Sequence, residues 1–358
     1  MTKLYRILAI IPQVEQTKIA VFHNDSCIYK VTIEHNRPFM YEHDELEEQI
    51  AHRKQAIIER LHDAGINLSK LHAVTSIGGM MKPVEGGTYS INEKMVEDLK
   101  RNYNGKHVSN LGALIAFEIA KSLNIDSFIV DPPVVNELNE EATFTGVPSI
   151  KRRSVFHALN QKLAARLVSA ELHRPYDRLN LIVAHLGMGI TIGAHHQGKI
   201  IDVNDGLLGE GPFSIERAGT LPLTSLISLC FSGQYSQEEL IDMLSFKSGL
   251  KAYFKTDDLK QIIKLIQRNG TETAPVIRAM TYQIAKEIGS MAAVLKGKVD
   301  GIVLTGILAE IETITWLITE RVSWISDVFI FPGEHYLQAL NEGTLRVLRN
   351  EEEAKVYA

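Results

Sequence analysis

Several glycines follow apolar segments of this 358-residue chain, and their type and position suit phosphate chemistry. A glycine turn at the end of a strand lets backbone N–H groups approach phosphate oxygens closely. For any one of these glycines, the simpler interpretation is a tight turn that the path of the chain requires. The glycines concerned are Gly78, Gly79, Gly187, Gly189, Gly209, Gly211 and Gly306.

Two clusters of nitrogen-bearing side chains suggest other chemistry. The basic triplet Lys151-Arg152-Arg153 has the charge to contact nucleic acid, and His195-His196 offers two imidazoles to a metal. Each cluster has a simpler explanation, because a basic triplet suits a solvated helix start and adjacent strand residues point to opposite faces. We therefore expect a helix start at the triplet and a surface strand at the two histidines.

Charge and composition exclude several classes of protein. Lys plus Arg number 38 and Asp plus Glu number 43, a net charge of −5 that gives no general attraction for nucleic acid or anionic membranes. The sequence has no apolar run of about 18 residues and no secretory signal pattern. Cys27 and Cys230 stand far apart without a CxxC pair, which argues against a disulfide framework. We expect a cytoplasmic protein that binds neither nucleic acid nor membrane.

The elements that must position these residues follow from hydrophobic periodicity. Strand meanders are predicted at 5–11, 17–23 and 28–33, and again at 179–185, 190–195 and 199–203. Helices are predicted at 44–64, 92–103, 109–123, 152–172 and 336–349 and over most of 221–298, and further strands at 71–77, 128–131, 301–306 and 328–331. Each meander is followed by alternating helices and strands, and the chain is longer than one core usually serves. This pattern predicts two α/β lobes built on one plan.

Longer stretches of the sequence resemble butyrate kinase, a branch of the acetate kinase family. They are HVSNLGALIAFEIAK at 107–121, KRRSVFHALNQKLAAR at 151–166, HLGMGITIGAHHQGKIIDVNDGLLGEGPFSIERAGTLP at 185–222, CFSG at 230–233, FPGE at 331–334 and LRVLRNEEEAKVY at 345–357. The resemblance implies an α/β, two-lobed actin-like (ribonuclease H-like) fold of the acetate kinase type. It implies an N-terminal lobe at 1–148 with a returning helix at 337–358, and a C-terminal lobe at 149–336 that carries the nucleotide-binding side and a dimer surface.

The resemblance also implies a reaction and assigns residues to it. The family reaction is reversible phosphoryl transfer from ATP to a short-chain carboxylate, which yields an acyl phosphate and ADP with Mg²⁺ as cofactor. By position in the matched motifs, Arg217 would stabilise the phosphoryl group, His185 would donate to a phosphate oxygen, and Asp131 would lie near the magnesium ion. The implied cofactor-binding residues are Lys18, Gly187, Gly189, Gly209, Gly211, Gly306 and Glu334.

Each of the three catalytic residues also has a purely structural interpretation. Arg217 would serve as an ion-pair partner between the lobes, His185 as a buried histidine with satisfied hydrogen bonds, and Asp131 as a turn cap. The matched motifs favour the catalytic interpretation in each case.

The sequence departs from the family pattern in its phosphate loops. The family's NPGSTSTK is replaced by IPQVEQTK at 11–18, HLGGG by HLGMG with Met188 in a glycine position, TGG by Thr305-Gly306-Ile307, and RGG by Ile77-Gly78-Gly79. Side chains in former glycine positions predict backbone strain and a filled phosphate cradle, and Glu15 adds repulsion toward phosphate. We therefore predict a weak or inactive butyrate kinase with reduced binding of ATP, ADP and Mg²⁺.

Two alternatives stay open. Gln13, Gln16 and Thr17 offer new hydrogen-bond donors and Lys18 offers a charge, in which case the loop is rebuilt and the kinase is active. Otherwise the chain would be a catalytically silent interaction or regulatory subunit. It would act as a homodimer or as the partner of an active paralogue, through the dimer surface that the resemblance implies.

Overall fold

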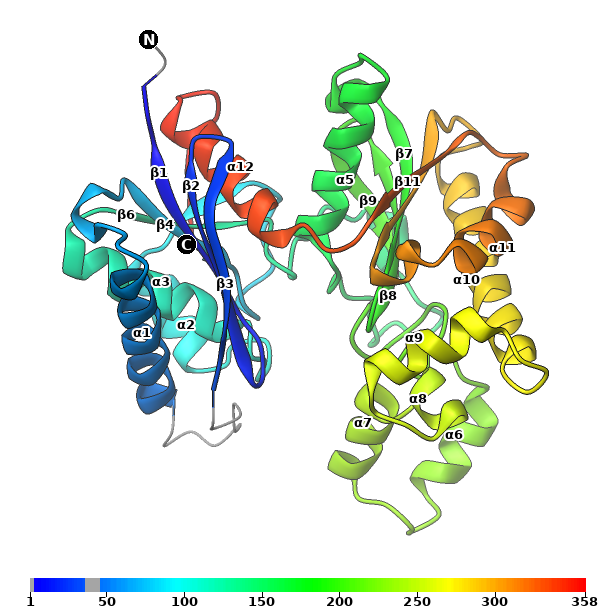
Figure 1. Cartoon of the computed structure of the whole chain (residues 1–358). Helices are drawn as coiled ribbons and strands as arrows, with labels where there is room; N and C mark the ends of the chain where they lie inside the picture. Colours follow the sequence, from blue (N-terminus) through cyan, green and yellow to red (C-terminus); the bar gives the residue numbers. More distant parts are fainter. Residues whose placement is uncertain (1–2, 36–45) are drawn as a thin grey trace. The chain divides into compact units, whose positions relative to one another are not determined.

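Two compact units make up the chain in the computed structural model, which describes residues 3–35 and 46–358 (Figure 1). Unit 1 comprises Met1–Val135 and His335–Ala358, and unit 2 comprises Asn136–Glu334. Each unit contains one β-sheet with helices packed against it. None of the helices in the described part of the chain is long and apolar enough to cross a membrane.

Residues 136–148, which we expected in the N-terminal lobe, pack with unit 2. The N–H of Asn139 donates to the carbonyl of Ile201 over 2.9 Å. The Glu137 carboxylate accepts from Lys162 Nζ over 2.9 Å and from the N–H of Ile200 over 2.8 Å. These bonds hold the segment to the second sheet, so the division falls after Val135 rather than after residue 148.

The sheet of unit 1 has seven strands in the order β12-β5-β6-β4-β1-β2-β3. Its strands are β1 (Arg6–Pro12), β2 (Gln16–His23), β3 (Ser26–Glu34), β4 (Ala73–Ile77), β5 (Thr88–Ser90), β6 (Asp126–Val130) and β12 (Lys355–Val356). Its helices are α1 (Leu46–Asp63), α2 (Glu93–Lys100), α3 (Asn110–Leu123) and α12 (Tyr336–Leu348), with a 3₁₀ turn at Leu68–Lys70. The helix expected at 44–64 corresponds to α1, and its first two residues lie outside the described residues.

The sheet of unit 2 has five strands in the order β11-β10-β7-β8-β9. Its strands are β7 (Asn180–Leu186), β8 (Ile190–His196), β9 (Lys199–Val203), β10 (Gly301–Gly306) and β11 (Val328–Pro332). Its helices are α4 (Glu140–Thr143), α5 (Ala158–Glu171), α6 (Leu223–Cys230), α7 (Gln237–Phe246), α8 (Gly249–Phe254), α9 (Leu259–Arg268), α10 (Ala274–Val294) and α11 (Glu312–Val322), with 3₁₀ turns at Tyr176–Arg178 and Ile307–Glu310.

The two sheets share one plan, as the repeated meander predicted. In unit 1, β1, β2 and β3 are antiparallel, and β4 and β6 then extend the sheet parallel to β1. In unit 2, β7, β8 and β9 are antiparallel, and β10 and β11 extend the sheet parallel to β7. Six of the seven residues of both β1 and β7 are buried. Central strands covered on both faces read as continuous apolar runs, which is why the sequence located them.

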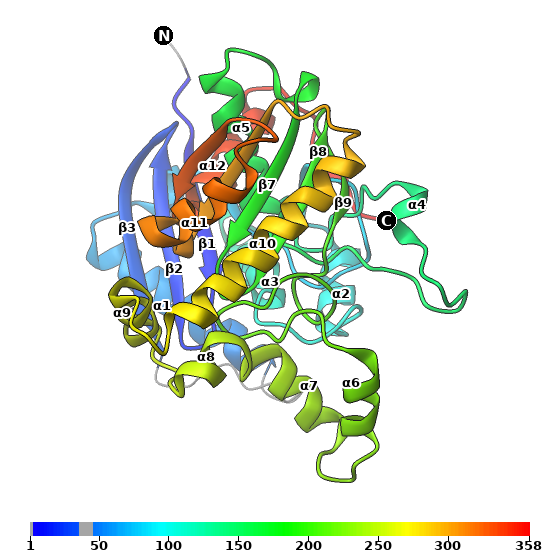
Figure 2. The same ribbon diagram turned by 90° about the vertical axis from the view of Figure 1, so that its right-hand side faces the viewer.

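Helices cover both faces of the unit 2 sheet. Figure 1 shows α5 on one face of this sheet and α10 with α11 on the other, and Figure 2 shows α10 in front of the strands. Apolar residues of β7, β8 and β10 pack with those of α10 and α11 into one cluster, which we call the unit 2 core. This packing fixes the carboxyl ends of β7 and β10, where the candidate site residues lie.

The basic triplet does not start a helix, contrary to our expectation. Helix α5 begins at Ala158, and residues 151–155 precede it without helical structure. Arg152 forms ion pairs with Asp202 over 2.8 Å and with Glu210 over 2.6 Å. Two of these basic side chains, Arg152 and Arg153, are therefore ion-paired within unit 2 rather than available as a solvated helix start.

Candidate functional site

The carboxyl ends of three neighbouring parallel strands bring polar residues together in unit 2. His185 lies near the end of β7, Thr305 lies near the end of β10, and Glu334 follows β11. Thr305 is paired in register with His185 across the β7–β10 ladder. In α/β sheets, ligands commonly bind outside the carboxyl ends of the parallel strands.

His185 is fully buried and has a defined hydrogen-bonding state. The Asn160 side chain of α5 donates from Nδ2 to His185 Nδ1 over 2.9 Å and to Thr305 Oγ1 over 3.1 Å. Because Nδ1 accepts, the ring proton of the neutral imidazole is on Nε2, which lies 3.7 Å from Glu334 Oε1. Burial, with a smaller contribution from the Arg217 charge, lowers the pKa of His185 to about 3. His185 is thus a neutral N–H donor at physiological pH.

A second histidine supports the ring of His185 from one side. The imidazole of His157, which precedes α5, stacks on that of His185 with 3.9 Å between ring centroids. Nδ1 of His157 is hydrogen-bonded to Thr191 Oγ1 over 3.0 Å. With the Asn160 bond, this stacking fixes both the plane and the tautomer of His185.

Glycines 187 and 189 make room for the polar side chains of the site. A Cβ on Gly189 would collide with the guanidinium of Arg217, and a Cβ on Gly187 would lie 2.8 Å from His185 Nε2. Neither glycine has a positive φ. The need for glycine here comes from close approach of side chains, since the backbone conformation itself suits any residue.

Arg217 is attached to the same turn through Ser214. The Ser214 hydroxyl donates to the carbonyl of Met188 and accepts from the N–H of Arg217 over 3.1 Å. The N–H of Ser214 in turn donates to the carbonyl of Arg217 over 3.0 Å. The loop that carries Arg217 and the turn after β7 therefore form one hydrogen-bonded unit.

The substituted glycine positions of unit 2 show no backbone strain, which corrects our expectation. Neither Met188 nor Ile307 has a positive φ. Both side chains are partly buried and pack against the unit 2 core. Gly306, between β10 and Ile307, does need glycine, because its φ is +94° and a Cβ there would lie 2.5 Å from the carbonyl oxygen of Leu186.

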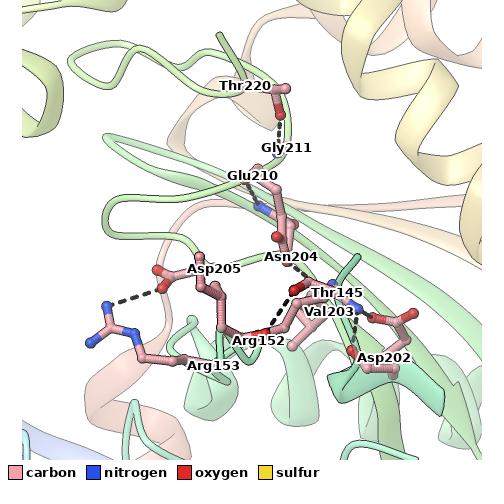
Figure 3. A network of polar contacts seen from close by, with 12 residues as sticks. Thr145, Arg152, Arg153, Asp202, Val203, Asn204, Asp205, Glu210, Gly211 and Thr220 are labelled. Carbon is pink, nitrogen blue, oxygen red and sulfur yellow. Dashed lines mark hydrogen bonds and ion pairs between the residues drawn. The ribbon is translucent and has the colours of Figure 1, made fainter. Parts of the chain in front are cut away.

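A polar network fixes the loop of residues 204–220 that leads from β9 to Arg217 (Figure 3). Besides the two ion pairs of Arg152, Arg153 pairs with Asp205 over 3.2 Å. Asn204 donates from Nδ2 to the carbonyl of Glu210 over 3.3 Å, and the N–H of Gly211 donates to Thr220 Oγ1 over 2.9 Å. Gly211 has a φ of +105°, so this turn requires glycine for conformational reasons.

A cavity of about 700 Å³ adjoins Arg217 within unit 2. Its walls come from the loop of residues 205–221 and from α6 and α7, and Gly209 lies in that loop. Leucine and isoleucine are the most frequent residues in its lining, and Arg217 contributes the guanidinium. Sequence reasoning missed this cavity, because its walls meet only when α6 and α7 fold back onto the loop.

Asp131 and Lys18 belong to unit 1. Asp131 directly follows β6, is buried, and has a φ of +38°. Its Oδ1 accepts the N–H of Gly87 over 2.7 Å, and its own N–H donates to the carbonyl of Gly87 over 3.0 Å. Lys18 is a half-buried residue of β2, paired in register with Ile11 of β1.

The turn between β1 and β2 is held by a buried arginine that sequence reasoning missed. Nη1 of Arg53, on α1, donates to the carbonyls of Gln13 over 2.9 Å and Gln16 over 3.1 Å, and Nη2 donates to that of Val14 over 2.8 Å. The N–H of His35 donates to the remaining carbonyl of the turn, that of Glu15, over 2.8 Å. The sequence did contain an indication that Arg53 is buried, because this residue shares the buried face of α1 with apolar residues.

Asp131 supplies one carboxylate, the kind of group that binds Mg²⁺. Within residues 3–35 and 46–358, no three His, Cys, Asp or Glu side chains form a group that could hold a metal ion. Mg²⁺ bound with a phosphate substrate keeps several waters and uses one or two carboxylates. Asp131 could be one such carboxylate ligand through Oδ2, since its Oδ1 accepts the N–H of Gly87.

The two histidines of β8 do not form a metal site, and one of them is not on the surface. His195 is fully buried and is hydrogen-bonded to Tyr176 Oη over 2.7 Å and to Gln161 Oε1 over 3.0 Å. His196 points to the opposite, exposed side and is hydrogen-bonded to Asn180. The expected surface strand is thus wrong for His195, because α5 covers that face of the sheet.

Solved structures similar to the whole chain define its class of fold. The acetate kinase of Porphyromonas gingivalis matches with a TM-score of 0.75 and 17% identity, covering 95% of this chain and 99% of that chain. The propionate kinase of Francisella tularensis subsp. tularensis SCHU S4 matches with a TM-score of 0.71 and 17% identity, covering 94% and 98%. The acetate kinase of Entamoeba histolytica matches with a TM-score of 0.71 and 17% identity, covering 95% and 99%. The two-lobed actin-like fold of the acetate kinase type is confirmed.

Sequence similarity then identifies the family. The sequence model described as the Acetokinase family matches residues 136–323, which is more than half of the chain and most of unit 2. The chain therefore belongs to the acetokinase family. The matched region contains His185, Arg217 and the cavity beside Arg217.

Proposed function

We propose that this chain is a carboxylate kinase of the butyrate kinase type, in which the acyl side of the site is retained and the nucleotide side is weakened. ATP with Mg²⁺ would supply the phosphoryl group, which passes to a carboxylate oxygen and leaves ADP and an acyl phosphate. Membership of the acetokinase family supports the reaction class. The roles of individual residues below are part of this proposal.

Arg217 and His185 would act on the acyl and phosphoryl groups. The Arg217 guanidinium has two-pronged donors suited to carboxylate and phosphoryl oxygens, and Gly189 leaves it room to lie against the backbone. His185 would donate its Nε2–H to a phosphoryl oxygen, because Asn160 holds it as the neutral Nε2–H tautomer. A neutral donor neither competes for the proton nor requires a counter-charge in a buried site.

Asp131 and Lys18 would serve the nucleotide from unit 1. Asp131 would hold the magnesium ion through its carboxylate, and Lys18 would place a positive charge near the phosphates. Gly306 would let the turn after β10 lie close to the backbone of Leu186, because any side chain at this position would collide with that backbone. Glu334 Oε1, 3.7 Å from His185 Nε2 and beyond hydrogen-bond distance, would place a negative charge beside that imidazole.

The proposal of a weakened nucleotide side depends on the structure of the turn between β1 and β2. All four carbonyls of residues 13–16 are bonded to Arg53 or to the N–H of His35. Val14 and Glu15 are the exposed residues of this turn, so it presents an apolar group and a negative charge. A phosphate loop needs small residues and donors at such positions. Removal of one preorganised donor commonly lowers turnover by about 10²–10³.

The test is direct measurement of acyl phosphate, trapped as hydroxamate, with ATP, Mg²⁺ and butyrate. We expect turnover at least about 100-fold below that of an active acetate kinase, and a further loss in Arg217→Ala. Arg268→Ala is the matched control, because Arg268 is an exposed arginine at the end of α9 in the same unit. Turnover equal to that of the active enzyme would refute the weakened nucleotide side.

One observation favours the second candidate function, a protein-interaction subunit. Helix α6 has no buried residue and no charged residue. Its Leu223 is 72% exposed and its Ile227 56%, and Phe231, which follows it directly, is 87% exposed. Isolated apolar groups are common on surfaces, whereas several on one short segment mark an interface. We propose that this segment pairs with a second copy of the chain or with a paralogue.

Light scattering after size exclusion tests the homodimer. We expect the mass of two chains for the wild type and of one chain for Phe231→Asp. Trp324→Asp is the control, because Trp324 is 78% exposed and lies after α11, away in sequence from α6. A wild type with the mass of one chain at about 50 μM would refute the homodimer.

A further inference from the structure

The cavity beside Arg217 is apolar on several sides. Leu207 and Leu208 line it from the loop, Leu226 from α6, and Leu240 and Leu244 from α7. Leu240 and Leu244 are four residues apart on one helix, so they present one continuous apolar stripe. Such walls recognise a hydrophobic group and reject a hydrated polar one.

Charged side chains of both signs line the cavity, and the negative ones are ion-paired. Asp205 and Glu210 line the cavity, but Asp205 pairs with Arg153 over 3.2 Å and Glu210 pairs with Arg152 over 2.6 Å. Arg153 thus pairs with Asp205, and Glu210 shares the charge of Arg152 with Asp202. The guanidinium of Arg217 is the cationic group in the cavity wall itself.

The size of the cavity exceeds what butyrate needs. Butyrate has six heavy atoms, and six water molecules, at about 30 Å³ each in the liquid, occupy roughly 180 Å³. The cavity measures about 700 Å³, within the range of pockets that hold ligands much larger than butyrate. A short acid would leave most of the leucine surface facing water.

We propose that the cavity binds a monocarboxylate with an apolar tail longer than that of butyrate, of about eight carbons or more or ending in an aromatic ring. The carboxylate sits on Arg217 and the tail extends between α6 and α7. This inference rests on the proposed carboxylate-binding role of Arg217, and it names the size class of the acid.

Affinity should therefore rise with chain length. Each methylene that becomes buried lowers Kd by about three- to fourfold. From butyrate to octanoate the four added methylenes should lower Kd on the order of 100-fold. The gain should continue to decanoate or 4-phenylbutyrate, whereas a pocket built for butyrate would show no gain.

Cys230 provides a readout that does not depend on turnover, because it is exposed and lines the cavity. The other cysteine, Cys27, is exposed on β3, so the experiment uses the Cys27→Ser chain. The rate of Cys230 alkylation by iodoacetamide is measured against butyrate, hexanoate, octanoate, decanoate and 4-phenylbutyrate. Octanamide serves as the neutral analogue, and Arg217→Gln tests the charge.

Two tryptophan variants of α6 test the location of the ligand. Leu226→Trp should fill the cavity and abolish protection by octanoate. Leu229→Trp is the matched control, since Leu229 is on the same helix with similar exposure but does not line the cavity. If Leu226→Trp fails to fold, the chain-length series on Cys27→Ser still decides the proposal.

The proposal is supported if octanoate protects Cys230 from alkylation at a concentration at least 30-fold below that at which butyrate does. Octanamide should give no such protection, and octanoate should give none in Arg217→Gln. Equal protection by octanoate and butyrate, or by octanamide, would overturn it. Measurement of hydroxamate formation distinguishes failure of this inference from failure of the proposed function. Turnover of butyrate without octanoate protection would overturn this inference alone, whereas protection without turnover would support it and leave the chain a binding protein.

Discussion

Replacing Arg53 by alanine should loosen the turn between β1 and β2 and destabilise unit 1. The side chain is fully buried, and burial lowers the pKa of its guanidinium to about 10, so it remains protonated at pH 7. It donates to three carbonyls of the turn and to Thr17 Oγ1 over 3.0 Å. The arginine thus links the middle of α1 to the turn and to the first residues of β2.

The size of the loss in unfolding free energy depends on which of these acceptors can bind water in the variant. Val14 is exposed and regains a water partner, whereas Thr17 is fully buried and would keep only its bond to His35. Hydrogen bonds to a charged donor contribute about 1.5–3 kcal/mol each, and truncation of a large buried side chain also leaves a cavity. We expect Arg53→Ala to lower the free energy of unfolding by about 3–5 kcal/mol. Arg53→Lys should be intermediate, because an ammonium cannot reach all four acceptors.

Urea unfolding followed by circular dichroism gives the free energy, and hydrogen exchange of peptides covering 6–23 gives the local effect. Arg60→Ala is the matched control, because Arg60 is an exposed arginine on the same helix and should change stability by less than about 0.5 kcal/mol. Faster exchange should be confined at first to the turn and its flanking strands. An Arg53→Ala protein as stable and as slowly exchanging as Arg60→Ala would refute the anchoring role.

Two further predictions concern unit 2. Burial, with a smaller contribution from Lys162, lowers the pKa of His195 to about 3, so the unfolded chain binds the extra proton and stability is lost as pH falls below about 6.5. His195→Gln should therefore reduce the loss of unfolding free energy between pH 7 and pH 5 by about 2 kcal/mol in urea titrations. His62→Gln is the control and should leave that loss unchanged, because the side chain of His62 is 89% exposed. Equal pH dependence of stability in the two variants would contradict the prediction. Gly306→Ala should lower the thermal midpoint by several degrees, because the φ of this residue is positive and a Cβ would collide with Leu186. Gly289→Ala, in open space on α10, should leave the midpoint unchanged or raise it. Equal midpoints in the two variants would disprove backbone strain at position 306.

The strands of both meanders were predictable because their residues are apolar and buried. The expected strands at 17–23 and 190–195 differ by one residue from β2 and β8. The short strands β5 and β12 were not predictable, because they pair across most of the chain and have three and two residues. Tertiary pairing determines such elements, and local sequence carries no signal for them.

The start of α5 was mispredicted for a related reason. Arg152 is charged and compatible with a first helical turn, yet its partners Asp202 and Glu210 lie about fifty residues further along the chain. Those ion pairs hold the segment extended until Ala158. His195 was placed on the surface for the same reason, since its partner Gln161 comes from a helix rather than from its own strand.

Of the candidate site, the sequence indicated the residue types but not their neighbours. His185 and Gly189 were located by their motif, whereas the Asn160 bond that sets the tautomer depends on how α5 packs on β7. Backbone strain at Met188 was mispredicted, because whether a former glycine position needs positive φ depends on the conformation of its turn. Arg53 was detectable as a charged residue on a buried helix face, but its acceptors were not.

Acyl phosphate formation with ATP, Mg²⁺ and a series of carboxylates from butyrate to decanoate tests the central claim most directly. The retained acyl side and weakened nucleotide side predict slow turnover, at least about 100-fold below an active acetate kinase with its own substrate, that is lost in Arg217→Ala and unchanged in Arg268→Ala. Turnover as fast as that of the active enzyme, or slow turnover that survives Arg217→Ala, would contradict it.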